Sequence, residues 1–262
     1  MIPEAAITHW RNVAPWPQDA QVEQDLILSR ALVEIFQEPA RSEALLLRGG
    51  TALHKLFITP PQRYSEDIDL VQAAPGPIGP VLDSIRARLD PLLGKPRREN
   101  NPSNVTLRYR VDSEIPPVVS LRLKVEINSR EHFAVFGPVT RSHSIRSPWF
   151  DGDAQIKTYA LEELLGTKLR ALFQRRKGRD LFDLWIGLGT GGTDPRRIVE
   201  AFRQYMRAEG ANVTREVFEK NLAEKVALRA FSDDLRPLLA PRARYDTSVA
   251  ARAVSDQLLS LL

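Results

Sequence analysis

The sequence RYSEDIDL at residues 63–70, preceded by LRGGT at residues 47–51, decides the fold of this 262-residue chain. Asp67 and Asp69 lie two residues apart in a short apolar run, so in a strand both carboxylates point to the same face. Two adjacent carboxylates repel each other, and a divalent cation that prefers hard oxygen ligands, such as Mg²⁺, removes that penalty. The pattern therefore predicts a metal site on a strand over residues 65–71.

A glycine pair precedes this strand at the expected start of a helix. Residues 44–47 read as a short buried strand, Gly49 and Gly50 break it, and residues 51–57 resume with a helical pattern. The free N–H groups at a helix N-terminus and the helix dipole bind phosphate. Phosphate binding beside a metal site indicates nucleotide chemistry.

Composition excludes several classes of protein. The hydrophobic fraction of 43% is sufficient for a real core, and the charged fraction of 27% is ordinary for a soluble chain. Cysteine is absent, which excludes disulfides, thiolate metal sites and a cysteine nucleophile. The four histidines lack the spacing of a zinc site. Without an 18-residue apolar stretch or a signal-peptide pattern, we expect no membrane association and a cytoplasmic location.

Charge is distributed unevenly along the chain. The first 69 residues carry six Lys or Arg and ten Asp or Glu, whereas the remaining residues carry 31 and 23. A basic distal part beside an acidic metal-binding stretch fits a polyanionic substrate. Solvated helix faces explain the same excess of basic residues equally well.

Two runs of strict alternation follow a helical segment at residues 81–93. In residues 105–111 and 119–127, apolar side chains alternate with polar ones, which predicts two half-buried strands. Glu126 falls on the polar face of the second run and is a candidate third carboxylate for the metal. A cross-strand ion pair with a neighbouring arginine is an equally good interpretation.

The segment at residues 137–152 contains two prolines and a glycine, and we expect a loop there with a domain boundary at residue 150. The sequence thus predicts a bilobed α/β protein. Residues 1–150 form a small twisted sheet with flanking helices, and residues 151–262 form a helical bundle that completes an active-site cleft. Helices are predicted at residues 17–37, 159–175, 178–188, 195–208, 214–231 and 247–261.

The segments LLLRGGTALHKLF (residues 45–57) and RYSEDIDL (residues 63–70) together resemble the nucleotidyltransferase fold of the DNA polymerase β superfamily. They are most similar to the AbiEii/AbiGii-type toxins, which include the MenT toxins of mycobacteria. The signature of this group is Gly-Gly-Thr followed by Ser-x-Asp-x-Asp. The resemblance implies that Gly49, Gly50 and Thr51, together with Ser65, bind the nucleotide.

A second segment, LEELLGTKLRALFQRRKGRDLFDLW at residues 161–185, matches the same group. Helical spacing places Lys168 within an apolar stripe, where a lysine usually extends its ammonium group into water. The resemblance instead implies a catalytic, nucleotide-binding Lys168 that offsets triphosphate charge, and a catalytic Asp180. A structural clamp between Asp180 and Arg176 or Arg179 remains the alternative.

Basic residues surround this aspartate in sequence. Possible RNA contacts are Arg175, Arg176, Lys177 and Arg179, and arginines further along the chain fit either a nucleic-acid backbone or a solvated helix face. The resemblance covers most of residues 44–190. The chain departs from the wider superfamily in one respect, because Glu126 stands where other members often carry Asp.

The resemblance implies a Mg²⁺-dependent nucleotidyltransferase toxin of a toxin–antitoxin pair, with Mn²⁺ as a possible substitute metal. It would transfer a nucleotide from an NTP to the 3′ acceptor end of tRNA or another RNA and so block translation. Asp67, Asp69 and Glu126 would hold the metal, and a cognate antitoxin is an expected partner.

Two alternatives stay open. In one, the acceptor is a small molecule or a protein hydroxyl, including that of Ser65 itself. In the other, the chain is a non-catalytic module that binds RNA or a protein partner through its basic part.

Overall fold

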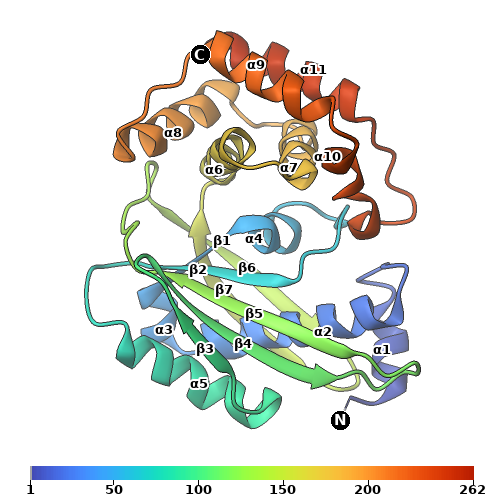
Figure 1. Cartoon of the computed structure of the whole chain (residues 1–262). Helices are drawn as coiled ribbons and strands as arrows, with labels where there is room; N and C mark the ends of the chain where they lie inside the picture. The colour runs from blue at the N-terminus through green and yellow to red at the C-terminus, as the bar shows by residue number, and fades with distance from the viewer. Residues whose placement is uncertain (1) are drawn as a thin grey trace. The chain divides into compact units, whose positions relative to one another are not determined.

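The computed structural model describes residues 2–262, apart from the side chain of Ala40, and the chain divides into two compact units (Figure 1). The first unit comprises Met1–Phe133 and Pro138–Tyr159, and the second comprises Ala134–Gly137 and Ala160–Leu262. The predicted α/β class is confirmed. The division between the units falls after Tyr159, whereas the sequence places the boundary at residue 150.

A seven-stranded mixed sheet forms the centre of the first unit, with the strand order β3-β4-β5-β2-β1-β7-β6. The central strand β2 runs antiparallel to β1 and parallel to β5, and β4 runs antiparallel to β5. The strands are β1 (Leu45–Arg48), β2 (Asp67–Gln72), β3 (Arg97–Asn100), β4 (Asn104–Asp112), β5 (Ser120–Asn128), β6 (Pro138–Arg146) and β7 (Asp151–Tyr159).

The two faces of this sheet differ in polarity because the side chains of each strand alternate. Ile68 of β2, Tyr109 of β4 and Val125 of β5 are fully buried on the apolar face. In Figure 1, α2, α3 and α5 lie on one side of the sheet and α4 lies on the other. The strands predicted from alternation, β4 and β5, and the predicted acidic strand β2 are confirmed.

Helices account for the rest of both units. The first unit contains α1 (Glu4–Trp10), α2 (Asp19–Phe36), α3 (Pro39–Ala44), α4 (Gly49–Leu56) and α5 (Gly79–Leu93). The second contains α6 (Leu161–Gln174), α7 (Gly178–Gly189), α8 (Pro195–Ala208), α9 (Arg215–Val226), α10 (Arg229–Asp233) and α11 (Thr247–Gln257), with short 3₁₀ turns at Arg236–Leu238 and Leu259–Leu261. Within the described part of the chain, none of these helices is long and apolar enough to span a bilayer.

The prediction of a loop at residues 137–152 was wrong, because this segment contains β6 and the start of β7. Strand β6 is the last in the sheet, and only His143 and Ile145 of its side chains are buried, so it lacks a clear alternating pattern. Pro138 begins this edge strand, where a missing N–H group is tolerated. The Pro148 region forms the turn between the strands, since the Ser147 hydroxyl accepts hydrogen bonds from two backbone N–H groups there.

The second unit is organised around α6, which packs against α7 and α8. A fully buried carboxylate, Glu163, accepts hydrogen bonds from the N–H groups of Val135 (2.7 Å) and Phe136 (3.0 Å) and from the Tyr205 hydroxyl (2.9 Å). These bonds attach the short segment Ala134–Gly137 to α6. The buried oxygens of Glu163 are thereby hydrogen-bonded, as buried polar groups in native cores usually are.

Replacing Gly178 by alanine should destabilise the second unit. Gly178 is the first residue of α7, and a Cβ atom there would lie 2.0 Å from the Phe231 carbonyl oxygen. We expect the G178A substitution to lower the free energy of unfolding by about 1–3 kcal/mol, as overpacking does. At Gly189, the other end of α7, an added Cβ atom would meet no atom within 4 Å, so G189A is the matched control. Equal denaturation midpoints for both variants would contradict the packing described here.

Candidate functional site

The two acids of β2 lie side by side on the polar face of the sheet. Asp67 is the first residue of β2, and its side chain is 29% exposed, while Ile68 between the two acids is fully buried on the opposite face. Burial raises the pKa of Asp67, and the neighbouring Asp69 carboxylate raises it further, although Lys124 acts in the opposite direction. The arrangement predicted from the Asp-Ile-Asp spacing is therefore present, and it carries an electrostatic cost.

Lys124 of β5 offsets part of this cost. Its Nζ atom lies 3.1 Å from Asp67 Oδ2 and 3.4 Å from Glu126 Oε2, because β5 runs beside β2 with Lys124 opposite Asp67. Burial would lower the pKa of Lys124, but the carboxylates of Asp67, Asp69 and Glu126 together raise it. The lysine is thus a fixed cation beside the acid pair. The contact of Lys124 with Asp67 depends on pairing between strands that are distant in sequence, so no local sequence pattern reveals it.

Glu126 lies opposite Asp69 in the β2–β5 register. One of its carboxylate oxygens accepts a hydrogen bond from the Asn104 side chain (2.9 Å), and the other faces Lys124. Among the described residues, no three acidic or histidine side chains come together as a metal-binding group. Glu126 forms an ion pair with Lys124 of its own strand rather than the predicted cross-strand pair with an arginine. Its role as a metal ligand stays a prediction.

Glycines let the start of α4 approach the acids closely. Gly49 has a φ of +78°, a backbone conformation that residues other than glycine rarely adopt. A Cβ atom at Gly49 would lie 2.3 Å from Asp69 Oδ2, and one at Gly50 would lie 2.3 Å from Arg63 Nη2 and 3.0 Å from Ser65 Oγ. The first N–H groups of α4, which have no acceptor within the helix, therefore begin beside the acid pair and the Ser65 hydroxyl.

Thr51 joins this helix to the acidic strand. Its hydroxyl is fully buried, donates to the backbone carbonyl of Asp67 and lies 3.0 Å from Ser65 Oγ. Thr51 is therefore in a position to orient the other groups rather than to meet a ligand itself. Ser65 is partly exposed.

A second cation faces the acids from β1. Arg48 lies opposite Asp69 in the β1–β2 register and donates to Glu131 at 2.5 Å. Burial would lower the pKa of Arg48, but the charges of Glu131 and Asp69 raise it. Asp67 and Asp69 are thus flanked by a cation on each neighbouring strand.

The acid pair fits a magnesium ion. Mg²⁺ is commonly bound by one or two carboxylates, with water and substrate phosphates completing its shell. Asp67 and Asp69 supply two partly exposed carboxylates on one strand, and the N-terminus of α4 beside them can receive phosphate oxygens. Two carboxylates with an adjacent phosphate site suit a metal–nucleotide complex better than a metal held by protein ligands alone.

A separate charge cluster lies in the second unit. Lys168 of α6 has its Nζ atom 2.8 Å from Asp183 Oδ2 and 3.4 Å from Asp180 Oδ1, and both aspartates of α7 are fully buried. Arg175 forms a bidentate ion pair with Asp180, in which Nε donates to Oδ2 and Nη2 donates to Oδ1, each at 2.7 Å. Burial would raise the pKa of Asp180, but Lys168 and Arg175 lower it overall.

This cluster settles two of the sequence interpretations. The ammonium group of Lys168 does not extend into water, since its side chain is only 7% exposed and contacts two carboxylates. The clamp on Asp180 exists, but its partner is Arg175 rather than Arg176 or Arg179. Of the proposed RNA contacts, Arg175, Arg176 and Lys177 are exposed, and Arg179 is half-buried. The catalytic roles of Lys168 and Asp180 stay predictions.

Residues 30–252 match the family described as nucleotidyl transferase AbiEii toxin, type IV toxin–antitoxin system. The chain belongs to this family. The resemblance seen in the two sequence motifs is therefore confirmed over most of the chain. A search among curated proteins found no match.

Solved structures share the AbiEii fold of this chain at low sequence identity. MenT4, a nucleotidyltransferase toxin from Mycobacterium tuberculosis, is similar with a TM-score of 0.61 and 16% identity, over 97% of this chain and 89% of that one. JHP933 from Helicobacter pylori is similar with a TM-score of 0.54 and 17% identity, over 92% of this chain and 91% of that one. At sequence identities this low, the likeness to these structures shows a common fold and nothing more.

The buried cluster of this AbiEii protein should make its stability depend on acid pH. The folded-state pKa of Asp180 lies below its ordinary value of 3.8, so its contribution is fully present above that value and is lost as pH falls through the folded pKa. At neutral pH, Asp180→Asn should lower the free energy of unfolding by about 1.5–3 kcal/mol, because the buried Lys168 loses one of its two carboxylate partners and the exposed Arg175 loses its charged acceptor.

The difference in free energy of unfolding between the wild type and Asp180→Asn should shrink as the pH falls below 3.8, the ordinary pKa of an aspartate. Chemical denaturation at a series of acid pH values measures this difference. Glu219→Gln, which removes an exposed pair with Arg215, is the control and should change stability by about 1 kcal/mol or less. A difference that stays constant with pH would contradict the depressed pKa of Asp180.

Proposed function

We propose that this toxin-family protein is a Mg²⁺-dependent nucleotidyltransferase that adds a nucleotide from an NTP to the 3′ end of tRNA and thereby blocks translation. The observation that carries the proposal is the acid pair of β2 beside the glycine-rich N-terminus of α4. These two features supply, on one sheet face, ligands for a metal and donors for a triphosphate. The name of MenT4, a nucleotidyltransferase toxin with the same fold, supports the same reaction class.

Each residue has a distinct task in the proposed reaction. The N–H groups of Gly49 and Gly50 and the Ser65 hydroxyl bind triphosphate oxygens. Asp67 and Asp69 would hold Mg²⁺, which would supply positive charge to stabilise the phosphate oxygens.

The proposed step is an in-line displacement at phosphorus. The 3′-hydroxyl oxygen of the RNA forms a bond to the α-phosphorus while the bond from that phosphorus to the β-phosphate oxygen breaks, and pyrophosphate leaves. The hydroxyl proton passes to a carboxylate of the site, for which Glu126 on the adjacent strand is the candidate. Holding both reactants in line accounts for much of the rate of such a reaction.

A second acceptor is favoured by the position of Ser65. Its hydroxyl is partly exposed and sits 3.0 Å from where a Cβ of Gly50 would be, so it lies beside the proposed phosphate site. Transfer to the protein itself would label this serine instead of RNA. A small-molecule acceptor or a module that only binds RNA would give neither product.

Replacing Asp67 tests the reaction directly. The Asp67→Asn variant should keep its fold, because Asp67 is partly exposed, and should lose about a hundredfold or more of nucleotide transfer, because it lacks one metal ligand. The assay incubates the protein with Mg²⁺, total tRNA and each labelled NTP in turn, and follows label on RNA and on protein.

Glu66→Gln is the matched control, since it removes one exposed negative charge from the adjacent position and should stay active. Nucleotide transfer by Asp67→Asn at the wild-type rate would contradict the proposed mechanism. Label found only on wild-type protein, and lost on Ser65→Ala, would favour self-modification. No label with any NTP would favour a binding module whose partner is RNA or the cognate antitoxin expected for a toxin–antitoxin family.

A further inference from the structure

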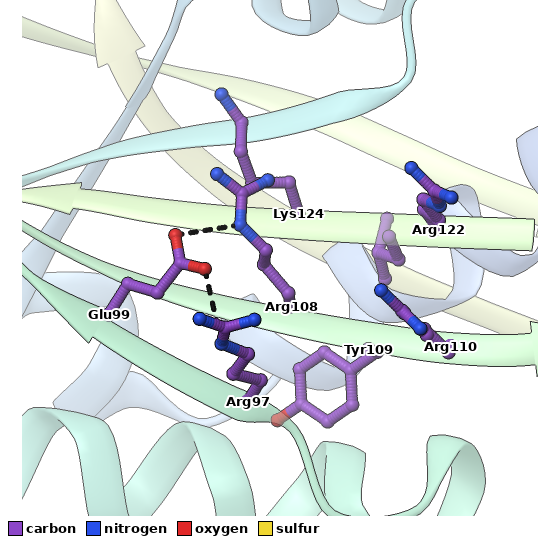
Figure 2. A pocket seen from close by; sticks show the side chains of 8 residues that line it. Arg97, Glu99, Arg108, Tyr109, Arg110, Arg122 and Lys124 are labelled. Carbon is purple, nitrogen blue, oxygen red and sulfur yellow. Dashed lines mark hydrogen bonds and ion pairs between the residues drawn. The ribbon is translucent and has the colours of Figure 1, made fainter.

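The polar face of the sheet carries a basic pocket beside the acid pair. Five cations of β3, β4 and β5 line this pocket of about 270 Å³, together with a single carboxylate, Glu99. Figure 2 shows the basic side chains projecting from three adjacent strands. We call this surface the basic groove, and its cations are Arg97, Arg108, Arg110, Arg122 and Lys124.

The groove places like charges directly opposite each other. In the register of β4 and β5, Arg110 is the partner of Arg122 and Arg108 is the partner of Lys124. Like charges in opposite positions of a sheet are destabilising, by roughly 0.2–1 kcal/mol for each pair. A sheet with only a structural role would avoid this arrangement, so the repulsion points to a ligand that neutralises it.

The single carboxylate of the groove, Glu99, neutralises positive charge only at the β3 end of the groove. Glu99 lies 2.9 Å from Arg108 and 3.4 Å from Arg97, as the dashed lines in Figure 2 mark. The side chains of Arg110 and Arg122 are exposed and form no ion pair with any other described residue. Asp112, two positions after Arg110 on β4, is the nearest carboxylate along that strand, but it is not paired with either arginine. These two arginines are therefore available to an external anion.

The groove is continuous with the candidate catalytic acids. Lys124 is the partner of Arg108 on one side and of Asp67 on the other, so one row of side chains crosses from β4 to β2. Arg122 lies two residues from Lys124 along β5, which separates the two by about 6.6–6.8 Å. A chain of phosphates that follows β5 from Arg122 would thus arrive at the acid pair.

Strand order separates the groove from the proposed triphosphate site. Strand β2 lies between β1, which leads into α4, and β5, which begins the groove. An NTP bound at the N-terminus of α4 would approach the acids from one side, and a ligand in the groove would approach them from the other. Two reactants need this placement for an in-line displacement.

We propose that the basic groove binds the phosphate backbone of the acceptor RNA strand, just upstream of its reacting 3′ end. This inference rests on the proposed transferase function. A polynucleotide fits better than a second triphosphate because the cations extend over three strands rather than converging on one point.

Recognition in the groove is by charge rather than by base. The one aromatic residue in its lining, Tyr109, has its side chain buried on the apolar face, where its hydroxyl donates to Asp90 at 3.0 Å, so it offers no exposed ring for a base to stack on. Proteins that select bases in single strands use such rings. The groove therefore holds RNA backbones with little regard to sequence.

The test compares two double variants of the full-length protein with equal net charge. Arg110→Gln/Arg122→Gln removes the unpaired arginines of the groove. Arg98→Gln/Arg146→Gln is the control, because Arg98 points to the opposite face of β3 and Arg146 lies on the edge strand at the other end of the sheet. Fluorescence anisotropy with a labelled single-stranded RNA measures binding over a series of salt concentrations, without any turnover.

The groove variant should bind this RNA about tenfold more weakly than the wild type, and the slope of log K against log salt should fall by about 1.4, or about 0.7 for each lost phosphate contact. The control should change neither quantity by a comparable amount. The affinity of the groove variant for a free NTP should stay at the wild-type value.

Thermal unfolding distinguishes ligand binding from a structural role. Removing both members of the repelling Arg110–Arg122 pair should leave the melting temperature of the groove variant equal to or above that of the wild type, whereas arginines that support the fold would lower it. Should the double variant fail to fold, Arg122→Gln alone gives the same comparison with an expected slope change of about 0.7.

Unchanged RNA affinity and salt slope in the groove variant would overturn the proposal, and so would a loss confined to NTP binding. If the wild type transfers nucleotides while both double variants bind RNA equally, the groove inference fails and the transferase function stands. If RNA binding depends on the groove but no NTP yields product, the groove stands and the proposed reaction fails.

Discussion

The repulsion between Asp67 and Asp69 is the constraint on which the rest of the first unit depends. Both carboxylates occupy one face of β2 because strand geometry repeats every two residues. Lys124 and Arg48 on the two neighbouring strands offset their charge, and the absence of a side chain on Gly49 lets α4 begin against Asp69. A divalent metal is the ligand that such a pair accommodates.

The polar face of the sheet can then be understood as an ordered sequence of charges. A helix N-terminus with partial positive charge lies on the β1 side of the acids, and a groove of arginines lies on the β5 side. Each of these features is unfavourable or weak in isolation. In the proposed function, they together hold a triphosphate, a metal and a polynucleotide on one rigid scaffold, and rigidity is what orients reactants.

Local patterns allowed the sequence to predict much of this arrangement, and non-local pairing explains what it missed. Alternation identified β4 and β5, and the Gly-Gly and Asp-x-Asp spacing identified α4 and β2. The edge strand β6 was not predicted, because so few of its side chains are buried that it shows little apolar alternation. The contact of Lys124 with Asp67 depends on parallel strands distant in sequence, and the choice of Arg175 as partner of Asp180 depends on the turn before α7.

Calorimetric titration of a non-hydrolysable NTP analogue, with and without Mg²⁺, tests the central claim that the acid pair is a metal–nucleotide site. We predict that Mg²⁺ strengthens nucleotide binding to the wild type and that Asp69→Asn abolishes this enhancement while leaving the fold intact. Nucleotide affinity that is independent of Mg²⁺, or an enhancement that survives in Asp69→Asn, would contradict it.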